Sequence, residues 1–404
     1  MARKLPLAAL AGASLLPLMV SAPAFAQNQS FVDVQAGVGF SSNPELRVDG
    51  SSSAFGRISA FGFTGWSSER SSTNLSAYVE NTSYLRRYGS RQILSLDAAH
   101  STQVNETTRL FGNLGFSTDF GAQLSSRFFG PPADSLPVNP ILPDTAVIVV
   151  TPDLNALNQR QYRFGGSGGV ATAISARDSI SATVGVQRIW FTGSETALLE
   201  NTSYDAALAW NRQVNERLSI GARLIGTRTT YTGDRSITTY GPQLTGSLLL
   251  SESLELGGAI GFVRQERNFD GSGDDSSTDL SLDASLCRRL EYERFCGRVG
   301  RRTQSAALGF AQTSTSITGD YSRRLSETDQ LQASLAVIRT DAPSGISFGK
   351  QTLYSLAGSY DKKISQRLSA GVTVAARKYT YAGPDPKADL GGSFFIRNRF
   401  GSVR

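Results

Sequence analysis

Residues 32–40 read VDVQAGVGF, and apolar residues alternate there with polar or small ones at every step. Successive side chains of a β-strand point to opposite faces, so this pattern predicts a strand with one apolar and one polar face. The same alternation recurs in residues 110–116, 180–186, 218–224, 254–262, 331–337, 368–374 and 390–400. Helical periodicity is rare after residue 27, and the sequence therefore predicts an all-β protein.

Short polar turns and longer connections alternate between these strands. The short turns lie at 105–107, 176–178, 215–217, 251–253, 326–329 and 365–367, and the longer connections at 41–52, 84–91, 193–201, 269–277 and 382–387. This rhythm is typical of transmembrane β-barrels, which have short periplasmic turns and long extracellular loops. We predict a single closed antiparallel barrel of about 18 strands over residues 27–404. A soluble sandwich would alternate too, but only closure pairs both edges of so large a sheet.

The first 26 residues have the features of an export signal. Arg3 and Lys4 precede an apolar run from Leu5 to Val20, and Ala24-Phe25-Ala26 precedes Gln27. A charged segment, an apolar segment and an A-x-A site together predict a signal peptide over residues 1–26. An uncleaved anchor helix is the alternative. With cleavage, residues 27–404 are expected in the cell outer membrane.

Composition excludes several classes of function. After the N-terminus no run approaches the roughly 20 apolar residues of a spanning helix, and one His and two Cys leave little for metal or redox chemistry. The only histidine, His100, falls on an outward row, so no Ser-His-Asp triad is predicted. Residues 166–171 (GSGGVA) lack the following helix of a nucleotide site, and residues 270–275 lack EF-hand spacing. We predict no enzyme, no metal, no cofactor and no nucleic-acid partner.

The polar rows carry the ionisable residues that a water-filled lumen would face. Barrels of about 16–18 strands leave an aqueous channel. Arg294, Arg298 and Arg302 share one strand face beside Asp279 and Asp283, and such segregated charge would orient dipolar solutes. Arginine and aspartate pairing into a structural plug is the alternative. The predicted pore-lining residues are Arg294, Arg298, Arg302, Asp279, Asp283, Glu255, Asp205 and Arg223.

The outward, apolar rows of several strands end in a basic residue. These residues are Arg188, Arg228, Arg264, Arg339 and Lys378. Each lies where an apolar band about 25 Å tall should end, so we predict a cationic collar facing the lipopolysaccharide phosphates of the outer leaflet. Ordinary snorkelling, or a bulge that turns the side chains inward, is the alternative. Aromatic residues near the row ends, as in an interfacial girdle, are Trp66, Trp190, Trp210, Tyr204, Tyr240 and Tyr360.

The two cysteines are placed symmetrically about one turn. A turn over Leu290–Glu293 puts Cys287 directly opposite Cys296, where Cβ atoms are about 4.5–5.5 Å apart. Because an exported chain meets an oxidising compartment, we predict a hairpin disulfide on the periplasmic rim. Two unpaired cysteines on a frayed turn are the alternative.

The longest connection, residues 121–159, contains six prolines and the apolar run AVIVV at 146–150. Connections of this length are usually functional or disordered. We favour an inward fold that constricts the lumen, or a cap, over simple disorder.

The last strand carries a pattern of its own. Residues 389–396 (DLGGSFFI) resemble the signal that the outer-membrane barrel assembly machinery reads: polar, x, Gly, x, x, apolar, x, apolar. The matching positions are Asp389, Gly391, Phe394 and Ile396. Such chains often stop at an aromatic residue, whereas this one continues from Phe400 to Arg404.

The opening strand and loop, residues 37–44 (GVGFSSNP), resemble the start of an outer-membrane β-barrel porin family of Gram-negative bacteria. Members of that family are often associated with exopolysaccharide loci. There the barrel is thought to complete the outer-membrane passage for a periplasmic polysaccharide-export protein. The resemblance therefore implies an export channel for exopolysaccharide. A passive diffusion porin and a non-conducting surface barrel are the alternatives.

Overall fold

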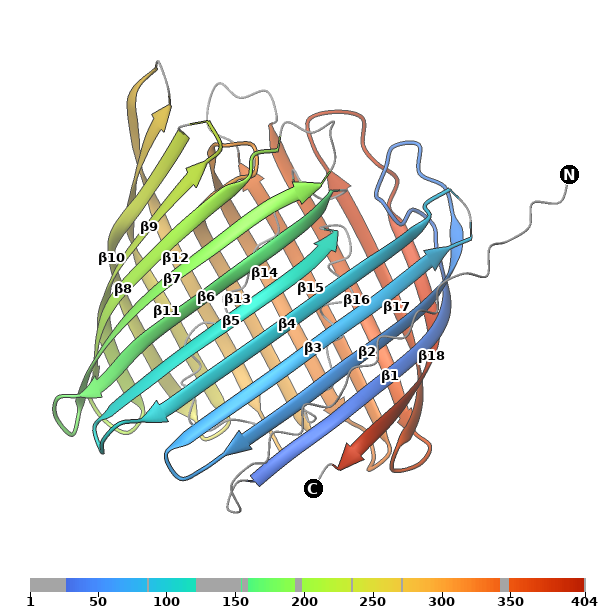
Figure 1. The fold of residues 1–404 in the computed structure, drawn as a ribbon, viewed down its shortest axis with the longest axis horizontal. Helices are drawn as coiled ribbons and strands as arrows, with labels where there is room; N and C mark the ends of the chain where they lie inside the picture. The colour runs from blue at the N-terminus through green and yellow to red at the C-terminus, as the bar shows by residue number, and fades with distance from the viewer. Residues whose placement is uncertain are drawn as a thin grey trace, which may run out of the picture.

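The computed structural model describes residues 27–402, except 86, 121–153, 155–158, 193–197, 234, 270–271 and 342–348. The predicted signal peptide, residues 1–26, lies outside the described residues. In the described part no helix is both long and apolar enough to cross a bilayer. The strands (Figure 1) are β1 (Gln27–Ser41), β2 (Ser53–Ser67), β3 (Ser71–Tyr84), β4 (Ser90–Gln103), β5 (Thr108–Phe120), β6 (Arg160–Ala173), β7 (Asp178–Thr192), β8 (Asn201–Gln213), β9 (Leu218–Tyr231), β10 (Arg235–Ser251), β11 (Leu254–Phe269), β12 (Ser272–Arg289), β13 (Glu293–Ser305), β14 (Ala311–Arg324), β15 (Asp329–Asp341), β16 (Lys350–Lys363), β17 (Leu368–Thr380) and β18 (Asp389–Ser402).

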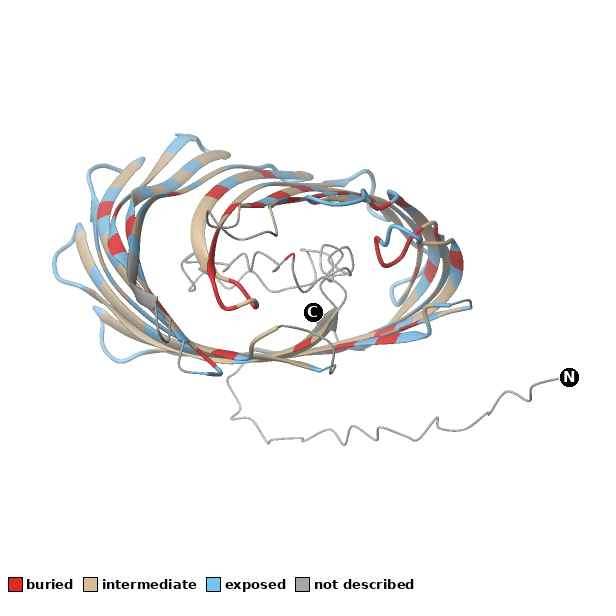
Figure 2. Ribbon diagram, turned by 90° about the horizontal axis from the view of Figure 1, so that it is seen from above, coloured by how far each residue is buried: buried red, intermediate tan, exposed pale blue. Residues whose placement is uncertain are grey.

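The strands form one closed antiparallel ring. Each strand pairs with its neighbours in the chain, and β18 pairs with β1 to close the 18-stranded sheet. The strands are tilted in Figure 1, and Figure 2 shows the ring from above. The chain enters β1 and leaves β18 at the end of the barrel that carries the short turns. The predicted single closed antiparallel barrel of about 18 strands is confirmed.

One type of hydrogen bond, from backbone amides to a side-chain oxygen, recurs in the turns at the short-turn end. The Oδ1 atom of Asn105 accepts hydrogen bonds from the backbone amides of Thr107 (2.9 Å) and Thr108 (2.7 Å). Asn215 repeats this arrangement, and so do the hydroxyls of Ser175, Ser326 and Ser365, whereas the hydroxyls of Ser251 and Ser68 each accept one such bond. Because Asn and Ser side chains replace a missing backbone partner, they favour tight turns at these points.

The opposite, long-loop end differs from the prediction at one place. Residues 269–277 are predicted to be a loop, whereas β11 continues to Phe269 and β12 already begins at Ser272. The prediction is wrong because β12 starts with SGDDSST, which has no apolar row to signal a strand. The hairpin therefore extends beyond the apolar part of the wall.

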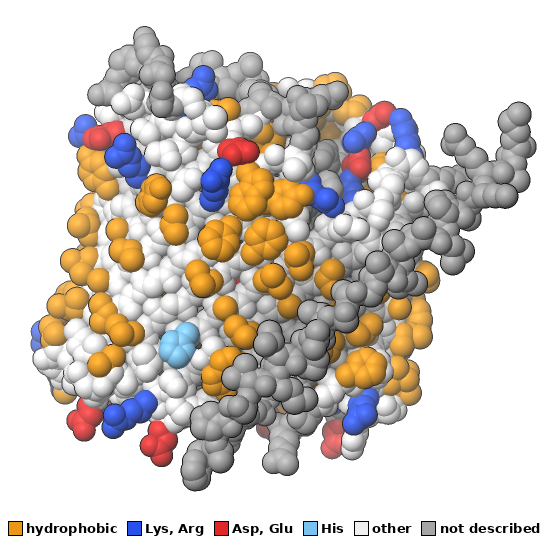
Figure 3. Space-filling view, in the orientation of Figure 1, with side chains coloured by type: hydrophobic (Ala, Val, Ile, Leu, Met, Phe, Trp, Pro, Cys, Tyr) orange, Lys and Arg blue, Asp and Glu red, His pale blue; other side chains and the backbone are white. Residues whose placement is uncertain are grey.

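The two faces of the wall have opposite chemistry. Outward side chains such as Val38, Val184, Leu244 and Val374 are 62–68% exposed, because nothing in the chain covers them. Figure 3 shows apolar side chains across the middle of one face of the outer surface, with charged residues near its upper and lower margins. The inward rows carry buried polar groups such as Ser59, Gln265 and Ser314.

The closing strand is fixed from the lumen side by two arginines. Arg399 of β18 donates two hydrogen bonds of 2.6 Å to Asp33 of β1, and its guanidinium lies 4.5 Å from the ring centre of Phe31. Arg397 pairs with Asp361 of β16, two strands away. Charge-assisted bonds of this kind are stronger than neutral ones and fix geometry.

Asp33→Ala should lower the free energy of unfolding by about 2–3 kcal/mol, because it leaves the half-buried Arg399 without its carboxylate. The measurement is urea denaturation in detergent, followed by tryptophan fluorescence. Asp97→Ala is the matched control, since Asp97 is exposed in the lumen and bonds only Ser95 among the described residues. That change should stay within about 0.5 kcal/mol. Equal losses in the two variants would contradict the role given to Asp33.

Candidate functional site: the lumen

The register places all eight predicted pore-lining residues on the lumen-facing rows. On β13, Arg294, Arg298 and Arg302 alternate with the outward Phe295 and Val299, which are 42% and 40% exposed. The other five, on β8, β9, β11 and β12, lie on the same inner face of the wall.

Two sets of polar contacts, which meet on β12, lie along the inner wall from β9 to β13. Arg223 donates to the Oε1 atom of Gln243 (3.0 Å from Nε), and the amide of Gln243 donates to Ser281 (2.9 Å). Asp283 forms an ion pair with Arg302 (3.2 Å). We call Arg223, Gln243, Ser281, Asp283 and Arg302 the polar track.

The structure thus brings together three residues that the sequence predicts and two that it does not. Gln243 and Ser281 were missed because they are uncharged. The signal that could have found them is positional, since Arg223, Gln243, Gly261 and Ser281 follow one another in a single row of the register.

Gly261 makes the middle contact of the polar track possible. A Cβ atom at this position would lie 2.8 Å from Cγ of Gln243 and even closer to the backbone of Pro242. Without a side chain on β11, Gln243 can reach from β10 across to Ser281 on β12. The polar track therefore depends on the glycine at position 261 as much as on the polar side chains of Gln243 and Ser281.

The remaining predicted lumen residues lie outside the track. Asp279 accepts a hydrogen bond from Thr303 (3.3 Å), and Asp205 accepts one from Thr227 (2.8 Å). In the described part of the chain no ion pair is present at Arg294, Arg298 or Glu255. Of the three predicted arginines of β13, Arg302 therefore forms an ion pair, whereas Arg294 and Arg298 form none with the described residues.

Cys287 and Cys296 are opposite each other in the register, with Cα atoms 4.1 Å apart, and they are joined as a disulfide. The bridge faces the lumen near the short-turn end. Glu255 and Asp320 flank it in the same row, one on each side.

The five predicted collar residues lie on the outward rows of the wall. Two of them, Arg264 and Arg228, are offset by two residues in the register, because Arg264 is opposite Tyr240, which is opposite Gly226. Carboxylates accompany three of the five: Arg188 with Glu200 (3.4 Å), Arg264 with Glu266 (3.3 Å) and Arg339 with Asp341 (3.2 Å). The collar is therefore a belt of mixed charge.

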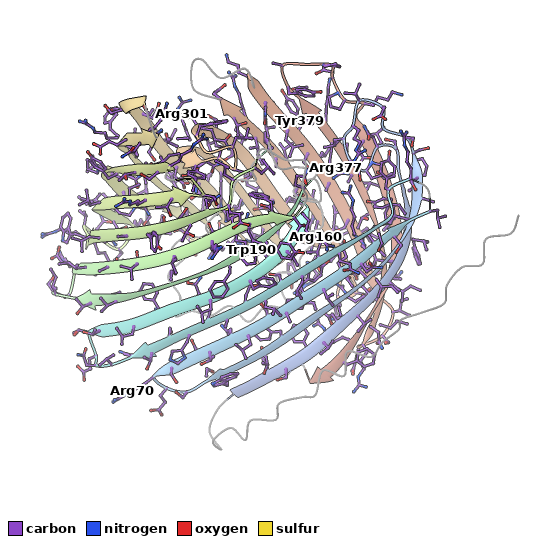
Figure 4. The ribbon with its side chains drawn as sticks, turned by 45° about the horizontal axis from the view of Figure 1, so that its top comes forward. Arg70, Arg160, Trp190, Arg301, Arg377 and Tyr379 are labelled. Atoms are coloured by element: carbon purple, nitrogen blue, oxygen red, sulfur yellow. A yellow bond between two sulfur atoms is a disulfide. The ribbon has the colours of Figure 1, made fainter. Side chains whose placement is uncertain are left out.

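Residues 42–52, which we call the inward loop, fold into the long-loop end of the lumen. Glu45 forms ion pairs with Arg91 of β4 and with Arg47. Arg377 of β17 donates to the carbonyl of Pro44 (3.3 Å) and pairs with Asp389 (Figure 4). Figure 2 shows this loop inside the ring.

Asp389 also accepts a hydrogen bond from the backbone amide of Asn43 (2.9 Å), so this residue of the predicted assembly signal holds the inward loop. Gly391 faces the lumen, whereas Phe394 and Ile396 point outward and are 48% and 47% exposed. Whether the assembly machinery reads them stays a prediction.

One described residue of the long connection 121–159 contacts the opposite wall. Leu154 packs with Leu46 of the inward loop, Ile338 of β15 and Leu353 of β16, against Tyr379. The connection joins β5 to β6, and β15–β17 lie across the ring from them. Residues 121–153 and 155–158 lie outside the described residues, so the predicted constriction stays a prediction.

No family model and no curated protein matches this chain. Among solved structures it is similar to the FrpB iron transporter of Neisseria meningitidis (10% identity over 87% of this chain and 62% of that one, TM-score 0.43). It is also similar to Pseudomonas aeruginosa OccK2 (9% identity, 94% and 99%, TM-score 0.45) and to a bacterial polysaccharide outer membrane secretin (9%, 91% and 98%, TM-score 0.35). The chain thus spans less than two thirds of the length of FrpB.

Glu45→Ala should release the inward loop, because Arg91 and Arg47 both lose their carboxylate partner. Tryptic cleavage after Arg47 in the folded protein should become about ten-fold faster. Asp49→Ala removes only the exposed pair with Arg87 and is the control, with a change within about two-fold. Unchanged cleavage in Glu45→Ala would show that other contacts hold the loop.

Proposed function

We propose that the chain is an outer-membrane channel for hydrophilic, carbohydrate-like solutes. The observation that carries this proposal is the inverted wall, apolar outside and polar inside. Water-soluble proteins rarely expose contiguous apolar patches beyond a few hundred Å². A ring of outward Val, Leu, Ile and Phe side chains is instead stabilised by lipid chains, and the pairing of β18 with β1 removes the two edges that an open sheet would expose.

The turn lengths and the mixed-charge belt also support one orientation of the barrel in the outer membrane. The short turns, the start of β1 and the end of β18 face the periplasm, and the mixed-charge belt lies at the outer leaflet. Arg228 and Lys378 suit direct contact with lipopolysaccharide phosphates. Glu200, Glu266 and Asp341 suit contact through divalent cations, which bind carboxylate and phosphate oxygens alike.

The chemistry of the lumen favours neutral, hydroxyl-rich solutes. Ion pairs balance many of the inner charges, so the wall presents alternating donors and acceptors instead of a field of one sign. These pairs are Asp33–Arg399, Asp361–Arg397, Asp283–Arg302, Asp389–Arg377 and Glu45–Arg91. Sugar hydroxyl groups both donate and accept hydrogen bonds, as Gln243 and Ser281 do.

Within this class, export of exopolysaccharide with a periplasmic export partner is the specific role that we favour. The polar track supports it, and so does the resemblance of residues 37–44 to a barrel family associated with exopolysaccharide loci. Passive diffusion of small hydrophilic solutes is the second candidate, and it is favoured by the inward loop and by Leu154, which narrow the passage. A non-conducting barrel follows if the long connection fills the lumen.

Planar-bilayer conductance of the purified protein tests the channel itself, and we expect defined single-channel steps. Sugar-driven swelling of proteoliposomes tests the solute class. Deletion of the gene in its host separates the two roles: loss of secreted polymer indicates export, and loss of sugar uptake indicates a porin. A protein that gives neither steps nor swelling would contradict the proposal.

Asp283→Asn and Arg302→Ala should shift ion selectivity in opposite directions, because each leaves the other charge of the pair uncompensated in the lumen. We expect Arg302→Ala to favour cations and Asp283→Asn to favour anions, each by roughly two-fold in permeability ratio. The reversal potential in a KCl gradient measures this ratio. Arg264→Gln changes an outward arginine and should leave the ratio unchanged.

Val184→Arg should destabilise the barrel in phospholipid vesicles by about 2–4 kcal/mol, because the side chain points outward four residues below Arg188, near the middle of the apolar band. Thr183→Arg places the same charge on the lumen side of the same strand and is the matched control. Equilibrium unfolding in vesicles should show little loss for Thr183→Arg. Equal losses would argue against lipid on the outer face.

A further inference from the structure

The wall separates between β12 and β13. These strands pair only from Leu282 with Arg301 down to Arg289 with Arg294. Above that point β12 still pairs with β11 as far as Ser272, and β13 still pairs with β14 as far as Ser305 and Ala311. Among the described residues, the edge of β12 from Ser272 to Ser281 therefore has no strand partner on this side.

The upper ends of β13 and β14, with the loop between them, turn into the lumen instead. We call residues 302–314 the inner hairpin. Ser305 donates a hydrogen bond to Thr229 of β9 (2.9 Å), although β9 is four strands away from β13 in the ring. Ala311 packs against Tyr231 and Ile237. Figure 2 shows part of the wall entering the ring and ending in a loop of buried residues.

The inner hairpin covers the inner face of its own barrel wall. Thr303 and Ser305 continue the row that is outward at Phe295 and Val299, but here they bond Asp279 of β12 and Thr229 of β9. The outer face of upper β13 thus lies against the inner faces of β9–β12. The upper parts of β10, β11 and β12 are thereby separated from the central passage.

The two separated edges match each other in register. Continuing the pairing of Leu282 with Arg301 would place residues 302–305 opposite residues 278–281, with Ser305 opposite Thr278. Residues 302–305 are Arg, Thr, Gln and Ser, which are polar and suit either environment. An unpaired edge presents free backbone donors and acceptors, so the edge of β12 offers the hairpin a second pairing partner.

We propose that the inner hairpin is a gate that exchanges between two partners. Bound to β9 and β10 it narrows the long-loop end of the passage, and paired with the edge of β12 it becomes part of the outer ring. Barrel diameter grows roughly linearly with strand number, so restoring the three strands β10–β12 to the wall of the passage raises conductance roughly 1.5-fold. The conducting role rests on the proposed channel function, whereas the exchange itself does not.

Two engineered disulfides test the gate, each in a Cys287→Ser, Cys296→Ser background so that only the new pair reports. Thr229→Cys with Ser305→Cys captures the inward position. Thr278→Cys with Ser305→Cys captures the paired position. Ser219→Cys with Ser247→Cys joins two static neighbours on β9 and β10, whose hydroxyls are 2.8 Å apart, and is the control.

We expect mass spectrometry to find both hairpin disulfides after mild oxidation of the folded protein. The Thr278–Ser305 link should give roughly 1.5-fold higher conductance than the Thr229–Ser305 link, and reduction should abolish the difference. The Ser219–Ser247 link should leave conductance unchanged. Failure of the Thr278–Ser305 link, while the control forms, overturns the exchange. Formation of both links with equal conductance overturns the gate. A protein that conducts in no state refutes the channel function, and the exchange is then judged from the formation of the two cross-links alone.

Discussion

Pairing of the backbone between β18 and β1 is the constraint on which the rest of the structure depends. An open sheet of this size would present two rows of unsatisfied amides and carbonyls, which lipid cannot hydrogen-bond. Closure removes both rows at once and leaves the side chains to sort into two environments. The apolar exterior and the polar lumen are consequences of that one ring, because every strand must then contribute alternate residues to each side.

Strict alternation is also the reason why so much could be predicted from the sequence. Once the outward row of a strand is known, the inward position of Arg302, Asp283 or Arg223 follows from parity alone, and so does the outward position of Lys378. The opposed cysteines follow from the symmetry of their turn. Strand number was accessible because Asn and Ser turns mark the ends of hairpins, and the one misjudged boundary, at Ser272, lies where both faces of a strand are polar.

Contacts between distant parts of the chain could not be predicted from the sequence. Glu45 and Arg91 pair across two strands, and Arg377 reaches Pro44 from the far end of the chain, so no local spacing marks them. Leu154 is one leucine in a long proline-rich connection, and only the fold reveals that it contacts the opposite wall. The inner hairpin belongs to the same class, because residues 302–311 carry no signal that distinguishes turning inward from continuing along the wall.

The two arginines of β18 have a consequence for biogenesis. Their carboxylate partners, Asp33 and Asp361, belong to strands that are synthesised earlier. These two acids therefore have no arginine partner until β18 has been made. A chain truncated before residue 397 retains the acids and loses both guanidinium groups. The charges of that sector of the wall are thus balanced only once β18 is in place, so this strand completes the ion pairs of the wall as well as its backbone pairing.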